Sequence, residues 1–175
     1  MAHCNFSSQK DAEIFAETKT SISHCPISNA YFANSVLEVK RLKSQGVNIG
    51  LATDISAGFS ASIYDNIRQS VICSRILEDG VDSRVSKEKR GVDDSRVSVI
   101  EAFYLATTGG GKALGLPLGL IKEGYICDLQ VVEMEKNKHS MFNSSKEMLQ
   151  KVLYLTEKEN IKQVWIQGKL VHEKI

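Results

Sequence analysis

Three polar residues lie where short apolar segments end, and their types could bind a metal or move protons. His3 is close to the first residue, His24 follows the segment TSIS, and Asp54 follows the segment VNIGLAT. If these segments are neighbouring parallel strands, the three side chains point from one edge of a sheet, where α/β folds place their sites. A cluster of histidine and aspartate there has the chemistry of a metal site that activates water.

Asp54 is the most informative of these positions, because an aspartate is an anion at neutral pH and can be a metal ligand or a general base. The segment DISAGFSAS that begins with it is small and polar, which leaves space for a ligand. An aspartate before a helix can also be an N-cap, and spacing alone leaves both interpretations open. Each histidine taken singly is more often a hydrogen-bonded structural residue. Cys4 and Cys25 offer further donors, but no cysteine spacing typical of a tetrahedral site accompanies them.

Composition and charge point away from several classes of protein. The 175 residues are enough for one domain or one piece of a larger one, and the hydrophobic content of 42% is ordinary for a globular protein. A formal net charge of +1 provides no field that would attract nucleic acid or an anionic membrane. The N-terminus lacks the pattern of a signal peptide, so we expect the four separated cysteines to be reduced thiols in the cytosol.

Repeated patterns of strand, loop and helix surround the candidate site. Serines followed three residues later by an acid predict helix starts at Ser8, Ser35, Ser62 and Ser98. Gly46 predicts the end of the second helix. The segment VNIGLAT does not alternate strictly between apolar and polar residues, which is typical of a parallel strand covered on both faces.

Later regions depart from this rhythm. Residues 77–98 contain GVDSRVSKEKR followed by the similar GVDDSRVS, and we interpret them as a solvated loop or insertion. Gly109–Gly111 interrupt the helix after Ser98, which favours a helix end or tight packing turn over a phosphate loop, because the full phosphate-loop pattern is absent. The last third predicts a small β element beside an α/β body, from a strand in YICDLQVVEM, a helix in SSKEMLQKVLYL and two strands in VWIQGKLV.

Five segments resemble, in the same order, segments of the amidohydrolase superfamily: MAHC, SISHCPISN, VNIGLATDISAGFSASI, EAFYLATTGGGKALGL and CDLQVV. The ending QKVLYLTEKENIKQVWIQGKLV narrows the resemblance to the guanine deaminase family. This resemblance implies an α/β fold, the C-terminal part of a metal-dependent (β/α)₈ TIM barrel with a small β-sandwich tail. Residues 1–116 would supply the last three barrel strands and their helices, and residues 117–175 the β-sandwich segment.

The resemblance also implies a reaction and a role for each site residue. The reaction is the zinc-dependent conversion of guanine and water to xanthine and ammonia, a step of purine catabolism. Asp54 would bind Zn²⁺, contact the substrate and take a proton from the attacking water, while His3 would hydrogen-bond that water as a second catalytic residue. His24 and Asn29 would line the floor of the pocket. A cytosolic homodimer that binds neither nucleic acid nor membrane is implied as well.

The chain departs from the family pattern in the ligands that precede His3. It lacks the H-x-H pair of the first strand, the histidine of the fifth strand and the residues that grip the purine. Ala52 and Ala57 stand where the family usually has glycine. Because a zinc hydrolase site needs about three protein ligands and Asp54 is the only direct one expected, we expect this polypeptide alone to bind zinc poorly and not to deaminate guanine. A chlorohydrolase, an adenosine-type deaminase and a non-catalytic truncated paralogue are the alternatives.

Overall fold

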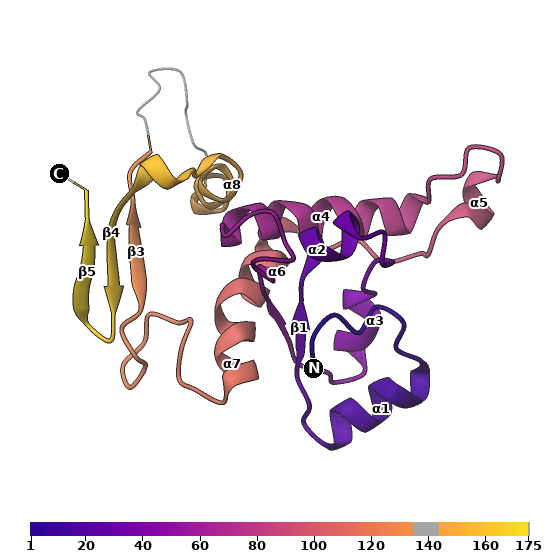
Figure 1. The fold of residues 1–175 in the computed structure, drawn as a ribbon, viewed down its shortest axis with the longest axis horizontal. Coiled ribbons are helices and arrows are strands. Elements are labelled where there is room, and N and C mark those ends of the chain that lie inside the picture. Colours follow the sequence, from indigo (N-terminus) through magenta and orange to yellow (C-terminus); the bar gives the residue numbers. More distant parts are fainter. Residues whose placement is uncertain (135–143, 175) are drawn as a thin grey trace.

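The structure, a computed structural model, describes residues 1–134 and 144–174 as an α/β body with a small sheet at one end (Figure 1). The first half contains α1 (Gln9–Glu17), β1 (Ile22–His24), α2 (Pro26–Tyr31), α3 (Val39–Ser44), β2 (Ile49–Leu51) and α4 (Ile63–Asp79). The middle contains α5 (Lys87–Arg90), α6 (Val99–Tyr104), the π-helical turn η1 (Leu105–Gly109) and α7 (Gly110–Leu114). The last part contains β3 (Leu129–Val132), α8 (Ser145–Leu155), the 3₁₀ turn η2 (Lys158–Asn160), β4 (Ile161–Ile166) and β5 (Lys169–Glu173). Among the described residues, no helix is both long and apolar enough to cross a membrane.

A parallel pair of strands, β1 and β2, lies at the centre of the body. The first residues of the chain run beside β1 in the same direction: Ala2 forms a parallel bridge with Ser23, and the His3 N–H donates to the Ser23 carbonyl at 3.0 Å. All residues of β2 are buried, which confirms the predicted strand covered on both faces. Three chain segments therefore end at the same edge of the molecule.

The hydrophobic core fills the space between this sheet and the helices that cover it. Side chains from β1, β2, α3, α4, α6 and α8 belong to this core, and each fully buried aliphatic side chain contributes about 1.5–3 kcal/mol. The largest of these buried side chains are Ile22, Leu37, Leu42, Ile49, Ile67, Leu105 and Leu153.

The helix starts follow the predicted serine–acid pairs in three places of four. Ser8, Ser62 and Ser98 each accept a hydrogen bond from the backbone N–H three residues later, as an N-cap does. The prediction at Ser35 is wrong, because α3 begins later, after Glu38. Ser35 has φ +63°, whereas an N-cap residue needs an extended backbone.

The predicted solvated loop at 77–98 is partly wrong. Helix α4 continues to Asp79, and the short helix α5 forms inside the segment. The carboxylate of Glu78 accepts hydrogen bonds from the backbone N–H groups of Ser95 and Arg96, at 3.0 and 2.9 Å. These bonds fasten the end of the segment to α4, so that only its middle projects from the body as α5 (Figure 1).

The glycine run packs the next helix against the parallel sheet. The helix does not end there: it passes through η1 into α7 and ends at Gly115, whose backbone is left-handed. A Cβ on Gly109 would overlap the backbone carbonyl oxygen of Ile49 in β2, whereas a Cβ on Gly110 would meet nothing nearer than the Leu105 carbonyl oxygen at 3.8 Å. The close-packing interpretation is therefore confirmed, and the predicted helix end at the glycines is wrong.

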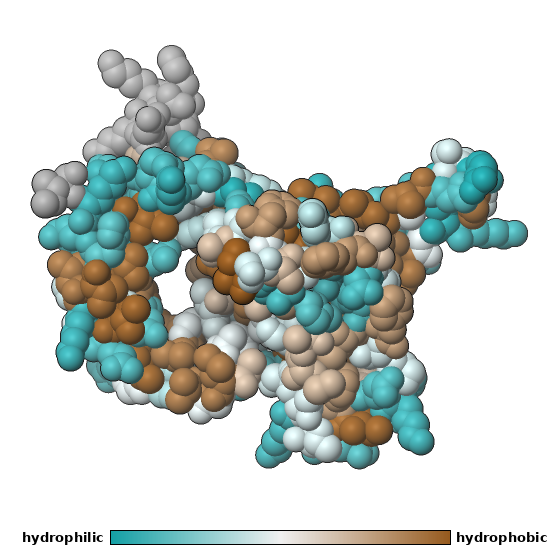
Figure 2. All heavy atoms as spheres, viewed as in Figure 1, coloured by the Kyte–Doolittle hydropathy of each residue, from teal (hydrophilic) through white to brown (hydrophobic). Residues whose placement is uncertain are grey.

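The small sheet at the end of the chain is antiparallel, in the order β3–β4–β5. Gln167 and Gly168 turn the chain between β4 and β5 with positive φ angles of 51° and 74°, which confirms the predicted Gln-Gly turn. Figure 2 shows an opening between this sheet and the helical body, and apolar atoms over the sheet. A single sheet is described in this part of the chain, so the β-sandwich stays a prediction.

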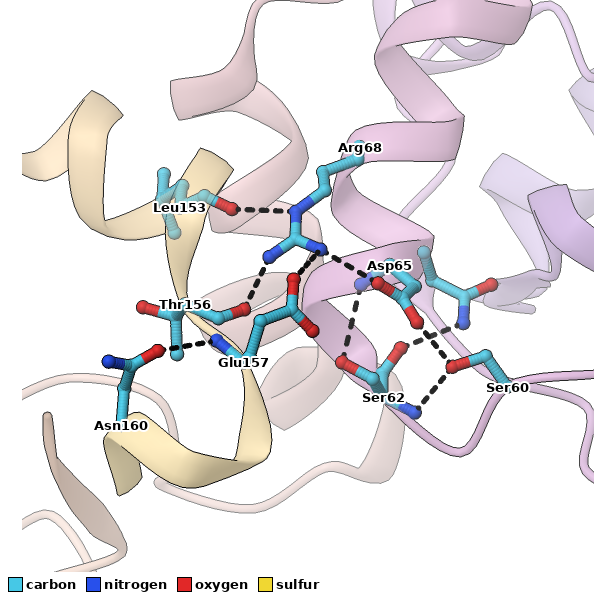
Figure 3. Close-up of polar contacts among 9 residues, drawn as sticks. Ser60, Ser62, Asp65, Arg68, Leu153, Thr156, Glu157 and Asn160 are labelled. Carbon is cyan, nitrogen blue, oxygen red and sulfur yellow. Dashed lines mark hydrogen bonds and ion pairs between the residues drawn. The ribbon is translucent and has the colours of Figure 1, made fainter. Parts of the chain in front are cut away.

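Arg68 of α4 joins the tail to the body (Figure 3). Its guanidinium donates to the backbone carbonyls of Leu153 and Thr156, at the end of α8. It also pairs with the carboxylates of Asp65 and Glu157, at 2.8 and 3.1 Å. Charge-assisted hydrogen bonds of this kind are stronger than neutral ones, so this side chain holds α8 against α4.

The tail segment is divided between the small sheet and the body. Helix α8 contacts both α4 and α6, and Leu153 belongs to the main core. Part of the second predicted range, residues 117–175, therefore packs with the first, residues 1–116. The division of the chain into these two ranges stays a prediction.

His24, the last residue of β1, lies in the interior and not on the surface of the sheet edge. Its side chain is 2% exposed, and its Nε2 lies 3.3 Å from the hydroxyl of Ser70 in α4. Its Nδ1 has no hydrogen-bond partner among the described residues. Burial, with a smaller contribution from the charge of nearby His3, lowers the pKa of His24 to about 3. The ring is therefore neutral at physiological pH.

We predict that Gly109→Ala and Gly110→Ala have opposite effects, although both glycines have helical backbone angles. Alanine at Gly109 must displace the Ile49 carbonyl and should lower the free energy of unfolding by about 2 kcal/mol or more. Alanine at Gly110 has space and should be neutral or stabilise the protein by up to about 1 kcal/mol, because it raises helix propensity. Urea unfolding of the two variants tests this; equal losses of stability would contradict the packing role.

We predict that burial of His24 makes the protein less stable in mild acid. The unfolded chain binds a proton at His24 near pH 6.5, whereas the folded chain binds it only near pH 3, so stability is lost as the pH falls between these values. Between pH 7 and 5 this group should account for a loss of about 2 kcal/mol in the free energy of unfolding. His24→Gln should remove that part of the difference between the two pH values.

The matched control is His172→Gln, because His172 lies exposed on β5. Denaturant unfolding at pH 7 and 5 should give His172→Gln the same difference as the parent protein. An unchanged difference in His24→Gln would mean that the buried ring does not titrate as inferred.

Candidate functional site

Three metal-ligating side chains meet at the carboxyl edge of the parallel strands. His3 ends the N-terminal segment, Cys25 directly follows β1, and Asp54 follows β2 after a short loop. One ligand atom from each residue lies within 4.8 Å of the other two. Nε2 of His3 lies 3.7 Å from Oδ2 of Asp54. The side chains of His3 and Asp54 are 35% and 30% exposed, so the group can be reached from solvent.

The backbone at two of these residues is left-handed. His3 has φ +62° and Asp54 has φ +52°, a conformation that is uncommon outside glycine and is concentrated at functional sites. The Asp54 carbonyl accepts a hydrogen bond from the Gly58 N–H, which closes the loop after β2. The alternative that Asp54 caps the next helix is wrong, because Ser62 is the N-cap of α4.

A chain of amide hydrogen bonds orients the His3 ring. The Asn5 side-chain amide donates to the Asn34 backbone carbonyl at 2.5 Å, and a carbonyl can only accept. The Asn5 side-chain oxygen therefore accepts from Asn29 Nδ2 at 2.9 Å, which leaves the Asn29 oxygen to face His3 Nδ1, also at 2.9 Å. In a neutral ring the proton of His3 is consequently on Nδ1, and the lone pair is on Nε2, the nitrogen that lies 3.7 Å from Asp54 Oδ2.

This tautomer gives the pair of His3 and Asp54 the character of a cation site. A neutral imidazole nitrogen and a carboxylate oxygen are both acceptors, so they repel each other unless a cation or proton lies between them. Their separation of 3.7 Å is too long for a direct hydrogen bond. Zinc-ligand lengths of about 2.0–2.2 Å for nitrogen and oxygen allow two such atoms to share one ion at this separation.

Cys25 contributes a buried thiol to the same group. Its side chain is 3% exposed, and its Sγ lies 3.5 Å from the Ser23 carbonyl. Burial raises the pKa of the thiol, and the negative charge of Asp54 raises it further. The free thiol is therefore protonated at neutral pH, and a metal ion would have to replace that proton.

The side chains of the adjacent residues His24 and Cys25 face different parts of the molecule. Sequence analysis expected His24 to point from the same edge as His3 and Asp54, and to line the pocket floor. The His24 ring instead faces α4, and the thiol of Cys25 takes its place in the group. Successive side chains of a strand point to opposite sides, so only one of two adjacent residues can face the site.

Of the other residues considered in the sequence, Asn29 contacts the site and Cys4 does not belong to it. Asn29, predicted to line the pocket, is buried and holds the ring of His3. Cys4 lies outside the three-residue group, and its thiol donates to the Ala2 carbonyl at 3.4 Å. Asn5 and Asn34 were not predicted at all; an asparagine near a histidine in sequence is the only signal that could have pointed to Asn5.

Comparisons with known proteins identify the family of the chain. The model of the family described as "Amidohydrolase family" matches residues 1–171. Guanine deaminase of Mus musculus is 33% identical over 98% of this chain and 38% of its own length. A crystal structure of guanine deaminase from C. acetobutylicum, with guanine bound in its active site, superposes with a TM-score of 0.79 at 28% identity, over 98% of this chain and 38% of that one.

A third similarity concerns the fold alone. An adenosine deaminase from Xanthomonas campestris with bound zinc superposes with a TM-score of 0.75 at 23% identity, over 97% of this chain and 36% of that one. The chain thus spans less than two fifths of the length of each of these proteins. Because the family match extends over nearly all of its residues, the chain belongs to the amidohydrolase family.

Proposed function

We propose that this chain carries the C-terminal part of a guanine deaminase-like site, which converts guanine and water to xanthine and ammonia. The pair of His3 Nε2 and Asp54 Oδ2 at the sheet edge, 3.7 Å apart, is the observation that carries the proposal. The similarity to guanine deaminases over 98% of the chain supports this substrate over those of other amidohydrolases. A cytosolic homodimer is part of the same proposal.

Asp54 and His3 have distinct roles in the proposed reaction. The carboxylate of Asp54 accepts a proton from the attacking water, whose oxygen adds to the ring carbon that bears the exocyclic amine. The lone pair on His3 Nε2 accepts a hydrogen bond from the same water, because Asn29 keeps the proton of the ring on Nδ1. The bond from carbon to the exocyclic nitrogen then breaks, and that nitrogen leaves as ammonia after it is protonated.

The residues present fit a divalent metal, in keeping with the metal dependence of the superfamily. Asp54 offers a carboxylate oxygen, which is a donor that zinc accepts, while the His3 ring nearby is left to bind the attacking water. When bound, zinc supplies Lewis-acid activation of the attacking water at neutral pH. The proposed cofactor is therefore Zn²⁺.

Two exposed aromatic rings, from the segments that follow Cys25 and Asp54 in the chain, support a flat heterocyclic substrate. Tyr31 ends α2, which begins just after Cys25, and Phe59 lies in the loop that follows Asp54. Their ring centroids are 6.5 Å apart, and the residues are 67% and 73% exposed. Aromatic faces in this position could stack against a purine, with a contribution of about 0.5–1.5 kcal/mol for each pair of rings.

We predict that the chain supports guanine deamination when it replaces the matching part of mouse guanine deaminase. In this zinc-loaded chimera, xanthine formation should be measurable, and Asp54→Asn should reduce kcat by about 10²–10⁴-fold because the proton acceptor is lost. The purified chain by itself should form no xanthine. Xanthine is followed by its ultraviolet absorbance.

Asp93→Asn is the matched control, because it removes the same charge from an exposed loop far along the chain. This variant should keep the kcat of the chimera. A folded, zinc-loaded chimera that converts adenosine or a chlorotriazine, and not guanine, would replace the proposal with the corresponding amidohydrolase activity. Equal kcat values for Asp54→Asn and Asp93→Asn would contradict the role of Asp54.

A further inference from the structure

We propose that Asn5 is a positioning residue that keeps His3 and Asp54 from hydrogen bonding to each other, so that both side chains stay free to accept from water. The inference deepens the proposed function and rests on it, because it concerns the two groups to which that proposal assigns the attacking water. Asn5 acts on the ring of His3 through the side chain of Asn29.

A backbone carbonyl at the far end fixes the direction of this amide chain. The Asn5 side-chain nitrogen lies 2.5 Å from the carbonyl oxygen of Asn34. If the whole chain reversed, the Asn5 side-chain oxygen would face that carbonyl at the same distance, and two acceptors so close repel each other. If Asn29 turned alone, its oxygen would face the Asn5 oxygen, across a contact of 2.9 Å. Asn5 therefore blocks both ways of turning Asn29.

Local hydrogen bonds hold both ends of the chain in place. The Cys4 carbonyl accepts from the backbone N–H of Ser7 at 3.2 Å and from its hydroxyl at 2.7 Å, in the turn that contains Asn5. The backbone N–H of Asn34 donates to the carbonyl of Asn29, at 2.8 Å. Every group that orients the ring thus lies close to it in the first fifth of the sequence, and its effect can be measured on the purified chain.

Without Asn5, a second arrangement of the His3 ring becomes available. Asn29 can then turn its amide and donate to Nδ1 of His3, which moves the ring proton to Nε2. That N–H would face Oδ2 of Asp54 across 3.7 Å, and a small side-chain movement would bring the two atoms to a hydrogen-bond distance of about 2.7–3.2 Å. In this paired state the carboxylate oxygen accepts from His3 instead of water, and Nε2 no longer accepts at all.

Nitrogen-15 NMR of the purified, metal-free chain tests the inference, because it reports which ring nitrogen carries the proton. At about pH 8.5 imidazole is neutral, and His3→Gln identifies the His3 signals among those of the four histidines. The parent chain should carry the proton mainly on Nδ1, whereas an unrestrained histidine in water favours Nε2. Asn5→Ala should lower the ratio of Nδ1–H to Nε2–H about fivefold, the effect of one lost hydrogen bond.

Asn34→Ala is the matched control for this measurement. It removes an exposed amide but keeps the backbone carbonyl to which Asn5 donates, so it should keep the parent ratio. Asn5→Asp should also keep the ratio, because a carboxylate accepts from the Asn29 amide as the original oxygen does.

The chimera with mouse guanine deaminase measures the consequence for the reaction. Asn5→Ala should lower its kcat about fivefold, in line with the loss of one hydrogen bond. The KM for guanine should not change, because the affected groups bind water. Asn5→Asp should restore kcat, which a merely structural role of the amide would not explain.

A parent chain with the His3 proton on Nε2 would overturn the inference, whether or not Asn5→Ala folds. An unchanged ratio in a folded Asn5→Ala chain would overturn it too, as would equal kcat values for the parent and Asn5→Ala chimeras. A parent chimera that forms no xanthine would refute the proposed function instead, and the ratios in the isolated chain would still decide whether Asn5 orients the ring.

Discussion

The parallel pairing of three chain segments is the constraint on which the candidate site depends. The N-terminal residues, β1 and β2 run in the same direction and are joined by backbone hydrogen bonds, so their carboxyl ends meet at one edge. Residues that are far apart in sequence, His3, Cys25 and Asp54, are brought together only by this pairing. The contact at Gly109 supports this pairing, because the absence of a side chain there lets the helical segment of Gly109 pack directly on the backbone of β2.

Sequence patterns predicted the local elements well and the orientation of side chains less well. Ser8, Ser62 and Ser98 were identified as helix starts because an N-cap depends on residues within one turn. The same pattern failed at Ser35, where burial of Leu37 in the core accompanies a left-handed serine backbone and a later helix start. Long-range packing overrode a short-range signal at that position.

Prediction of the site had a similar limit. The order of strand and acid was enough to place Asp54 at the sheet edge with His3, and the resemblance to amidohydrolases gave the same two residues a role. The choice between His24 and Cys25 could not be made from sequence, because it depends on which side of β1 the helix α4 covers. The asparagines that orient His3 were equally out of reach, since Asn5, Asn29 and Asn34 meet through the tertiary fold.

The burial of His24 has a consequence for the edge beside it. A protonated imidazole next to Cys25 would repel a cation held by the carboxylate at this edge. Burial against Ser70 holds the pKa of His24 at about 3, so this ring carries no charge at neutral pH. A bound cation would lower that pKa still further, because like charges disfavour protonation. His24, which was predicted to face the site and instead faces α4, therefore still affects the site. Its neutral ring keeps the interior next to Cys25 free of positive charge.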